Sequence, residues 1–183
     1  MARLLLLNGP PGIGKSTLAR RYAADRPGTL VCDVDVLRTL IGGWQDDFGG
    51  AGALIRPAAL AMITAYLRGG QDVVLPQLLA DPAELARFEA AATEAGADFL
   101  ERVLMDDADA TVARFHRRGS DGADPWHDQV RAIVAGQGGD AHLRDRHAVL
   151  TRLLGERTGA IAVPSREGDV EGTYSALIAT LAR

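Results

Sequence analysis

The 183-residue chain has one cysteine, one lysine and few aromatic residues, and it lacks a long hydrophobic run near its start. Because the single cysteine, Cys32, cannot form an internal disulfide, a reducing compartment is favoured. The apolar run Leu4 to Leu7 is far shorter than the about 20 residues that span a bilayer, and we find no signal-peptide pattern. We therefore expect a cytoplasmic protein with no membrane partner.

Charge and length indicate which classes of protein and how many domains to expect. Acidic residues number 24 against 20 basic ones, and the net charge of −4 argues mildly against a nucleic-acid-binding protein. At this length we expect one globular domain over residues 1–183. Lys15 is the only lysine, since the other 19 basic residues are arginine, and it lies inside a glycine-rich motif.

That motif, GPPGIGKS, has the G-x-x-x-x-G-K-[ST] spacing of a P-loop, which binds the phosphates of a nucleotide. Its glycines let backbone N–H groups approach phosphate oxygens, and the following helix N-terminus attracts negative charge. Lys15 supplies a compact positive charge for the β- and γ-phosphates, Ser16 is expected to hold Mg²⁺, and Thr17 can reach the α-phosphate. The predicted ATP-binding residues are Gly9, Pro10, Pro11, Gly12, Ile13, Gly14, Lys15, Ser16 and Thr17.

Strand-like and helix-like segments alternate along the chain. Strands are predicted at 3–8, 29–33, 72–76, 97–105 and 159–163. Helices are predicted at 16–24, 36–41, 53–68, 82–95, 107–118, 125–135, 140–157 and 169–182. Five strands joined by helical crossovers predict a parallel sheet covered on both faces, the three-layer α/β fold of P-loop NTPases.

The segments GPPGIGKS, DVDVLR (33–38) and RFHRRG (114–119), in this order, resemble the small P-loop kinases. The chain looks most like the chloramphenicol phosphotransferase, tunicamycin-resistance and zeta-toxin-like group. This resemblance implies ATP and Mg²⁺ as cofactors, an arginine-bearing lid at about 114–127, and an adenine site against residues 164–167. It also implies an aspartate after the second strand as the catalytic base.

Asp35 matches that aspartate best, because the pattern of Asp35 followed by Val-Leu-Arg resembles Asp-x-x-Arg in adenylylsulfate kinase and Val-Asp-x-Leu in chloramphenicol phosphotransferase. A carboxylate here would lie beside the phosphate loop and could deprotonate an acceptor hydroxyl. Asp35 could instead cap the helix predicted from Val36, or do both. Asp33 is the second candidate, for Mg²⁺ or for the substrate. Arg38 could contact the acceptor or the γ-phosphate, or be a surface residue.

The third predicted strand departs from many P-loop enzymes, which place a Mg²⁺-binding aspartate at its end. Here the strand is followed by the uncharged Gln77. Either Asp33 or Asp35 serves the metal instead, or metal binding is weaker. Gln77 could hydrogen-bond the substrate, or it could be a turn residue without a role.

The glycine-rich segment at about 42–52 is predicted to be a loop that closes over the acceptor. Trp44 and Phe48 could stack on an apolar or planar substrate, whereas Asp46 and Asp47 would disfavour a polyanion. The alternative is a mobile surface loop with one aromatic residue packed in the core.

Three arginines lie near the end of the helix predicted over 107–118, and the spacing of Arg114, Arg117 and Arg118 puts them on one helix face. An arginine at the γ-phosphate stabilises the charge of the transition state. We expect Arg118 to act on the phosphates and Arg114 to contact phosphate or adenine. Alternatively, these charges only stabilise the helix C-terminus. No metal-ligand spacing is present, so no zinc is expected.

Together these features predict an ATP- and Mg²⁺-dependent phosphotransferase that acts on a hydroxyl of a small molecule, such as an antibiotic or a nucleoside-like acceptor. The catalytic candidates are Asp35, Lys15, Arg118 and Asp33. The candidates for substrate binding are Asp35, Arg38, Trp44, Phe48 and Gln77. The alternatives are a polynucleotide 5′-hydroxyl kinase and a non-catalytic ATP-binding protein that sequesters a drug. The sequence leaves the oligomeric state open.

Overall fold

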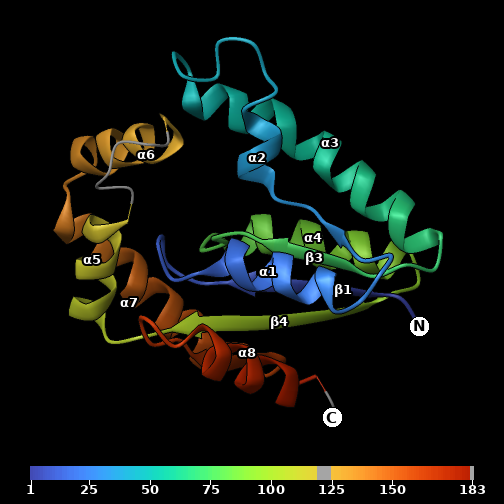
Figure 1. The fold of residues 1–183 in the computed structure, drawn as a ribbon. Helices are drawn as coiled ribbons and strands as arrows, with labels where there is room; N and C mark the ends of the chain where they lie inside the picture. Colours follow the sequence, from blue (N-terminus) through green and yellow to red (C-terminus); the bar gives the residue numbers. More distant parts are fainter. Residues whose placement is uncertain (119–124, 182–183) are drawn as a thin grey trace. The chain divides into compact units, whose positions relative to one another are not determined.

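The computed structural model describes residues 1–118 and 125–181. Its five strands form one parallel sheet in the order β2-β3-β1-β4-β5, which confirms the predicted P-loop NTPase fold. The elements are β1 (Arg3–Asn8), α1 (Lys15–Ala24), β2 (Leu30–Val31), α2 (Val34–Arg38), α3 (Phe48–Arg68), β3 (Val73–Pro76), α4 (Pro82–Glu94), β4 (Asp98–Met105), α5 (Ala108–Arg117), α6 (Pro125–Gly136), α7 (Asp140–Glu156), β5 (Ala160–Pro164) and α8 (Val170–Ala179) (Figure 1).

The chain divides into two compact units that are interleaved in sequence. The first unit comprises Met1–Asn8 and Lys15–Arg102, and the second comprises Gly9–Gly14 and Val103–Arg183. The glycines of the phosphate loop thus belong to the second unit, whereas the lysine and serine that end the motif begin α1 in the first. The expected single domain over 1–183 stays a prediction.

In the first unit, β1 pairs with β3, and β3 pairs with β2. Alternate residues of β1 and β3, such as Leu4, Leu6 and Val73, share one core with α3 and α4. The residues between them, such as Leu5, point to the opposite face, because side chains alternate along a strand, and α1 packs against these strands. Helix α3 packs against α2 and α4 (Figure 1).

Helix α3 is long and apolar enough, by length and composition, to cross a membrane. A core helix of a soluble protein passes the same test, so this property alone is weak evidence for a membrane span. Ile55, Ala59, Ile63 and Leu67 of α3 belong to the core of the first unit, as expected of a core helix.

The predicted loop at 42–52 is wrong in its second half, because α3 begins at Phe48. The Asp47 carboxylate caps this helix by accepting a hydrogen bond of 2.8 Å from the Gly50 N–H. The cap and the packing of α3 on the core outweigh the low helix propensity of the glycines. The second strand is also shorter than predicted, since only Leu30–Val31 form β2.

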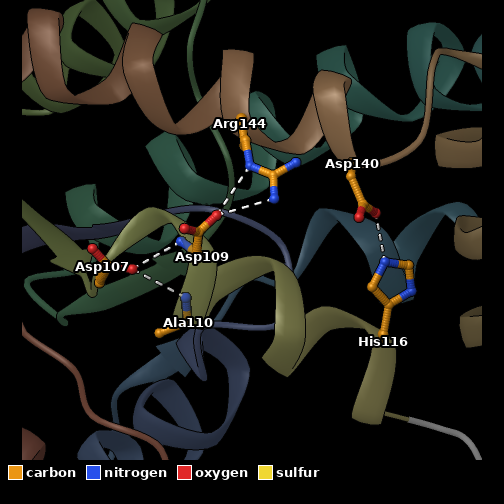
Figure 2. A network of polar contacts seen from close by, with 6 residues as sticks. All are labelled: Asp107, Asp109, Ala110, His116, Asp140 and Arg144. Atoms are coloured by element: carbon orange, nitrogen blue, oxygen red, sulfur yellow. Dashed lines mark hydrogen bonds and ion pairs between the residues drawn. The ribbon is translucent and has the colours of Figure 1, made fainter.

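In the second unit, α5 and α7 are linked by polar contacts along their length (Figure 2). Asp107 caps α5 by accepting hydrogen bonds from the backbone N–H groups of Asp109 and Ala110. The Asp109 carboxylate binds the Arg144 guanidinium at 3.0 Å, and Nε2 of His116 lies 2.6 Å from Asp140. These contacts flank an apolar cluster of Val112, Phe115, Val134 and Leu143. Residues 119–124 of the predicted lid at about 114–127 lie outside the described residues.

The buried Cys32 gives a test of this fold. Burial raises the pKa of its thiol to about 12, and the neighbouring Asp33 adds to the rise. At pH 8 only about 10⁻⁴ of such a thiol is ionised, and the thiolate is the reactive form. We expect a thiol reagent at pH 8 to label the native protein at least about 10³-fold more slowly than the urea-unfolded chain. Equal labelling rates would contradict the buried position of Cys32 directly after β2.

Candidate active site

The phosphate loop joins β1 to α1, and three of its glycines have backbone angles that other residues rarely adopt. The φ angles are 148° at Gly9, 83° at Gly12 and 103° at Gly14. A Cβ atom on Gly12 would lie 3.2 Å from the Cα of Phe115, so α5 also requires a glycine there. The first turn of α1 carries no acidic residue, which suits a helix N-terminus that binds phosphate.

The other predicted residues of this loop differ in their exposure. Gly9, Pro10 and Ile13 are buried, Lys15 and Ser16 are half-buried, and Thr17 is exposed at the start of α1. The Ser16 hydroxyl donates a hydrogen bond of 2.9 Å to Oδ2 of Asp33. This bond joins the motif to the aspartates that follow β2.

Asp33 has two partners. Oδ2 accepts the Ser16 bond, and Oδ1 accepts the backbone N–H of Asp35 at 3.1 Å, so Asp33 is the residue that caps α2. The alternative in which Asp35 caps a helix from Val36 is therefore wrong, because α2 begins at Val34 and Asp35 lies in its first turn. The Ser16 hydroxyl and the Asp33 carboxylate offer only oxygen atoms, the ligands that Mg²⁺ prefers.

Asp35 lies in a different environment from Asp33. Its side chain is 40% exposed, and Oδ1 lies 3.6 Å from Nη2 of Arg38. Desolvation by the surrounding protein raises the pKa of the Asp35 carboxyl, against the lowering influence of Arg38, and Asp33 raises it further. The Lys15 and Arg56 cations also oppose the rise. A carboxylate that water can reach and whose proton affinity is raised is suited to general base catalysis.

Gln77 follows β3, at the position that is acidic in many P-loop enzymes. Its backbone N–H donates to the Leu7 carbonyl at 3.2 Å, and its side chain is buried. Its Oε1 has no hydrogen-bond partner within residues 1–118 and 125–181. The chain after it is fixed by Asn8, which donates to the Leu79 carbonyl and to Glu101 and accepts from the Leu79 N–H. The acid beside Ser16 is thus Asp33, after β2.

Arg38 and Phe48, which are both predicted to bind the substrate, contact each other, and their role in substrate binding stays a prediction. The Cζ atom of Arg38 lies 3.9 Å from the centre of the Phe48 ring, and Arg38 is buried. Trp44 is half-buried between α2 and α3, and its predicted contact with substrate stays a prediction.

The predicted lid arginines differ in their surroundings. Arg114 donates from Nη1 to the Ser165 carbonyl at 3.1 Å and to its hydroxyl at 3.4 Å, and this hydroxyl donates to the Ile13 carbonyl at 3.0 Å. Nη2 of Arg114 lies 3.1 Å from the position of a Cβ on Gly14. Arg114 is therefore held beside the phosphate loop through Ser165, and no local signal in the sequence indicates this bridge.

The other two arginines lie in different surroundings. Arg117 forms an exposed ion pair with Glu167. The predicted common face for Arg118 is wrong, because α5 ends at Arg117 and Arg118 is extended and exposed. Its expected action on the phosphates stays a prediction.

This arrangement predicts a larger role for Arg114 than for its helix neighbour. We expect Arg114→Ala to lower turnover by about 10²-fold or more if it stabilises charge at the phosphates. Ser165→Ala, which only loosens Arg114, should cost about tenfold. Arg117→Ala is the matched control, and an exposed pair of this kind should change turnover by less than about threefold. Steady-state kinetics that show equal losses for Arg114→Ala and Arg117→Ala would contradict this assignment.

Comparison with solved structures supports the fold. The chain is similar to a presumed kinase from Chloroflexus aurantiacus (16% identity, TM-score 0.70), covering 99% of this chain and 96% of that one. It is similar to the tunicamycin resistance protein of Deinococcus radiodurans (19%, TM-score 0.62; 100% and 96% covered). It is also similar to a gluconokinase from Sinorhizobium meliloti (14%, TM-score 0.60; 98% and 93% covered).

Sequence comparison gives the family. No curated protein matches the chain significantly. A family described as an AAA domain matches residues 4–137, which include the phosphate loop, the two aspartates after β2 and the arginines of α5. The chain therefore belongs to this AAA domain family, and it shares its fold with the solved structures named above.

Proposed function

We propose that the protein is an ATP- and Mg²⁺-dependent phosphotransferase that moves the γ-phosphate of ATP to a hydroxyl of a small molecule. The observation that carries this proposal is that the two aspartates after β2 have different surroundings. Asp33 is engaged by the Ser16 hydroxyl at 2.9 Å, while Asp35, two residues later, has a water-accessible carboxylate near the Lys15 cation.

Each part of the site would have one task. Backbone N–H groups of the loop and Lys15 bind the phosphates, and Ser16 with Asp33 would hold Mg²⁺. Bound Mg²⁺ would neutralise charge on the β- and γ-phosphates. Asp35 accepts the proton of the acceptor hydroxyl as its oxygen attacks phosphorus and ADP departs. The Arg114 guanidinium would stabilise charge on the transferred group.

The acceptor class follows from charge. Asp33 and Asp35 lie on the acceptor side, and Arg38 is already engaged by Asp35 and Phe48. Two carboxylates on the acceptor side favour an uncharged or cationic acceptor over a phosphorylated one, because like charges repel. The similarity to a tunicamycin resistance protein adds a hydroxylated antibiotic or a nucleoside-like molecule to the candidates. The proposal includes a cytoplasmic location, because the ATP that the reaction consumes is cytoplasmic.

The role of Asp33 gives a prediction about the metal. Asp33→Asn removes one negative charge but keeps the shape of the side chain. We expect it to raise the Mg²⁺ concentration for half-maximal activity by about tenfold or more, as loss of a group that orients a metal site does. A Mg²⁺ titration of both proteins tests this. An unchanged Mg²⁺ requirement with a lower maximal rate would move the base role to Asp33.

The proposed function is tested with ATP–Mg²⁺ and a panel of acceptors: chloramphenicol, tunicamycin, aminoglycosides, macrolides, nucleosides, sugars and a 5′-hydroxyl oligonucleotide. Mass spectrometry detects an added phosphoryl group, and calorimetry measures ATP binding separately. A phosphorylated small molecule is the expected result. Phosphorylation of the oligonucleotide alone would make the protein a polynucleotide kinase, and tight ATP binding without any product would support a sequestering protein.

A further inference from the structure

Arg38 ends α2 and is among the few charged side chains that the first unit buries. It is 5% exposed, although it follows the half-exposed Asp35 by only one helical turn. A buried guanidinium costs several kcal/mol unless partners compensate for its lost hydration. The groups around Arg38 therefore indicate the role of this buried charge.

Phe48, Gly52 and Asp35 lie close to the guanidinium. The Phe48 ring lies on one side, with its centre 3.9 Å from Cζ. Gly52 lies against it as well: a Cβ there would lie 3.0 Å from Nη2, 3.2 Å from Nε and 3.3 Å from Cζ. The Asp35 carboxylate lies 3.6 Å from Nη2.

Phe48 and Gly52 are four residues apart in the first turns of α3, so they lie on the same helix face. The aromatic ring attracts the cation, and the missing side chain of Gly52 leaves the space that the flat guanidinium fills. The segment GGAG is therefore helical and also shaped for an arginine. We call this arrangement of Phe48 and Gly52 around Arg38 the arginine slot.

We propose that Arg38 is a positioning residue: the arginine slot on α3 fixes its guanidinium, which in turn holds the Asp35 carboxylate in the orientation that activates the acceptor hydroxyl. This inference rests on the proposed function, since it takes Asp35 as the base. It assigns Arg38 and Phe48 to the base rather than to the substrate.

The proposal also bears on which acceptors fit. A phosphate or sulfate group on the acceptor would have to displace Asp35 to reach Arg38, and the buried slot leaves little of Arg38 to contact. The acceptor is then bound without help from this cation. Lysine could not replace Arg38, because an ammonium lacks the plane that fits between a ring and a glycine.

Gly52→Ala is the variant that best distinguishes the proposed positioning role from a purely structural one. Alanine favours a helix over glycine, so a purely structural position in α3 would tolerate or gain from this change. We expect it instead to lower kcat by about tenfold or more, with the KM for the acceptor within about twofold. Gly49→Ala is the matched control, because a Cβ there meets only a single atom of Asp47 at 4.0 Å. A Gly52→Ala protein with wild-type kcat would overturn the proposal.

Variants of Arg38 and Phe48 distinguish a positioning role from direct substrate binding. Arg38→Lys keeps the charge, and its kcat should fall about as strongly as that of Gly52→Ala. Phe48→Tyr keeps an aromatic face, so its kcat should fall less than that of Phe48→Leu. If Arg38 bound the acceptor directly, Arg38→Lys would raise the acceptor KM and leave kcat nearly unchanged. That split would overturn the proposal.

A stability measurement tests the slot without any turnover. In urea unfolding, the effects of Arg38→Met and Phe48→Leu should be non-additive, since each removes the same contact. Additive effects would overturn the slot itself. Failure of the proposed function would appear differently, as a wild-type protein that phosphorylates no acceptor while this coupling persists.

Discussion

Asp35→Asn is expected to bind ATP as tightly as the wild type and to lose phosphoryl transfer by about 10²–10⁴-fold, the contribution of a general base. The amide keeps the size of the carboxylate but cannot accept the proton of the acceptor hydroxyl. ATP affinity should survive, because the phosphate loop and Lys15 provide it. Single-turnover transfer from labelled ATP and calorimetric ATP binding measure the two quantities separately.

The outcome distinguishes the two aspartates after β2. If Asp35→Asn loses less than about tenfold in rate while Asp33→Asn loses activity at every Mg²⁺ concentration, the base is Asp33. The Ser16 hydrogen bond to Asp33 favours the opposite result. An Asp35→Asn protein that no longer binds ATP would mean that the change disturbs the site as a whole.

Lys15→Ala is expected to have the second large effect, with ATP binding or transfer reduced by about 10³-fold. Its ammonium supplies positive charge to the β- and γ-phosphates, where charge changes during transfer. Thermal unfolding of the variant without nucleotide should stay close to the wild type, because Lys15 is half-buried at the start of α1 rather than in a core.

Lys15→Arg sharpens this test. The chain uses arginine at 19 of its 20 basic positions and lysine only here. Because a guanidinium is longer and planar, we expect Lys15→Arg to be nearly as inactive as Lys15→Ala. Nearly full activity in Lys15→Arg would mean that only the charge matters and that the lone lysine has no special role.

Local patterns in the sequence predicted the position of the phosphate loop between β1 and α1. The phosphate loop follows from contiguous residues, and its glycines have the positive φ angles that the motif requires. Asp33 and Asp35 were predicted beside the loop because carboxyl ends of parallel strands share one edge of a sheet. Their separate tasks were left open, because the contacts that differ between them, Ser16 with Asp33 and Arg38 with Asp35, are not visible in the sequence.

Long-range packing explains what the sequence did not predict. Glycines at 49, 50 and 52 indicate a loop, yet the Asp47 cap and the core contacts of α3 make this segment helical. The arginine slot could not be predicted for Arg38, because Phe48 and Gly52, which form it, belong to another helix. The Ser165 bridge joins positions more than a hundred residues apart, and no pattern of neighbouring residues reveals it.

The measurement that tests the account most directly is the fate of the labelled γ-phosphate of ATP in wild type and Asp35→Asn, each with Mg²⁺ and a hydroxylated small-molecule acceptor. The account predicts that the wild type transfers label to the acceptor and that Asp35→Asn binds ATP but transfers almost none. Label that reaches the acceptor equally in both proteins would contradict Asp35 as the base. Label that never leaves ATP in the wild type, with every acceptor of the panel, would contradict the assignment as a phosphotransferase.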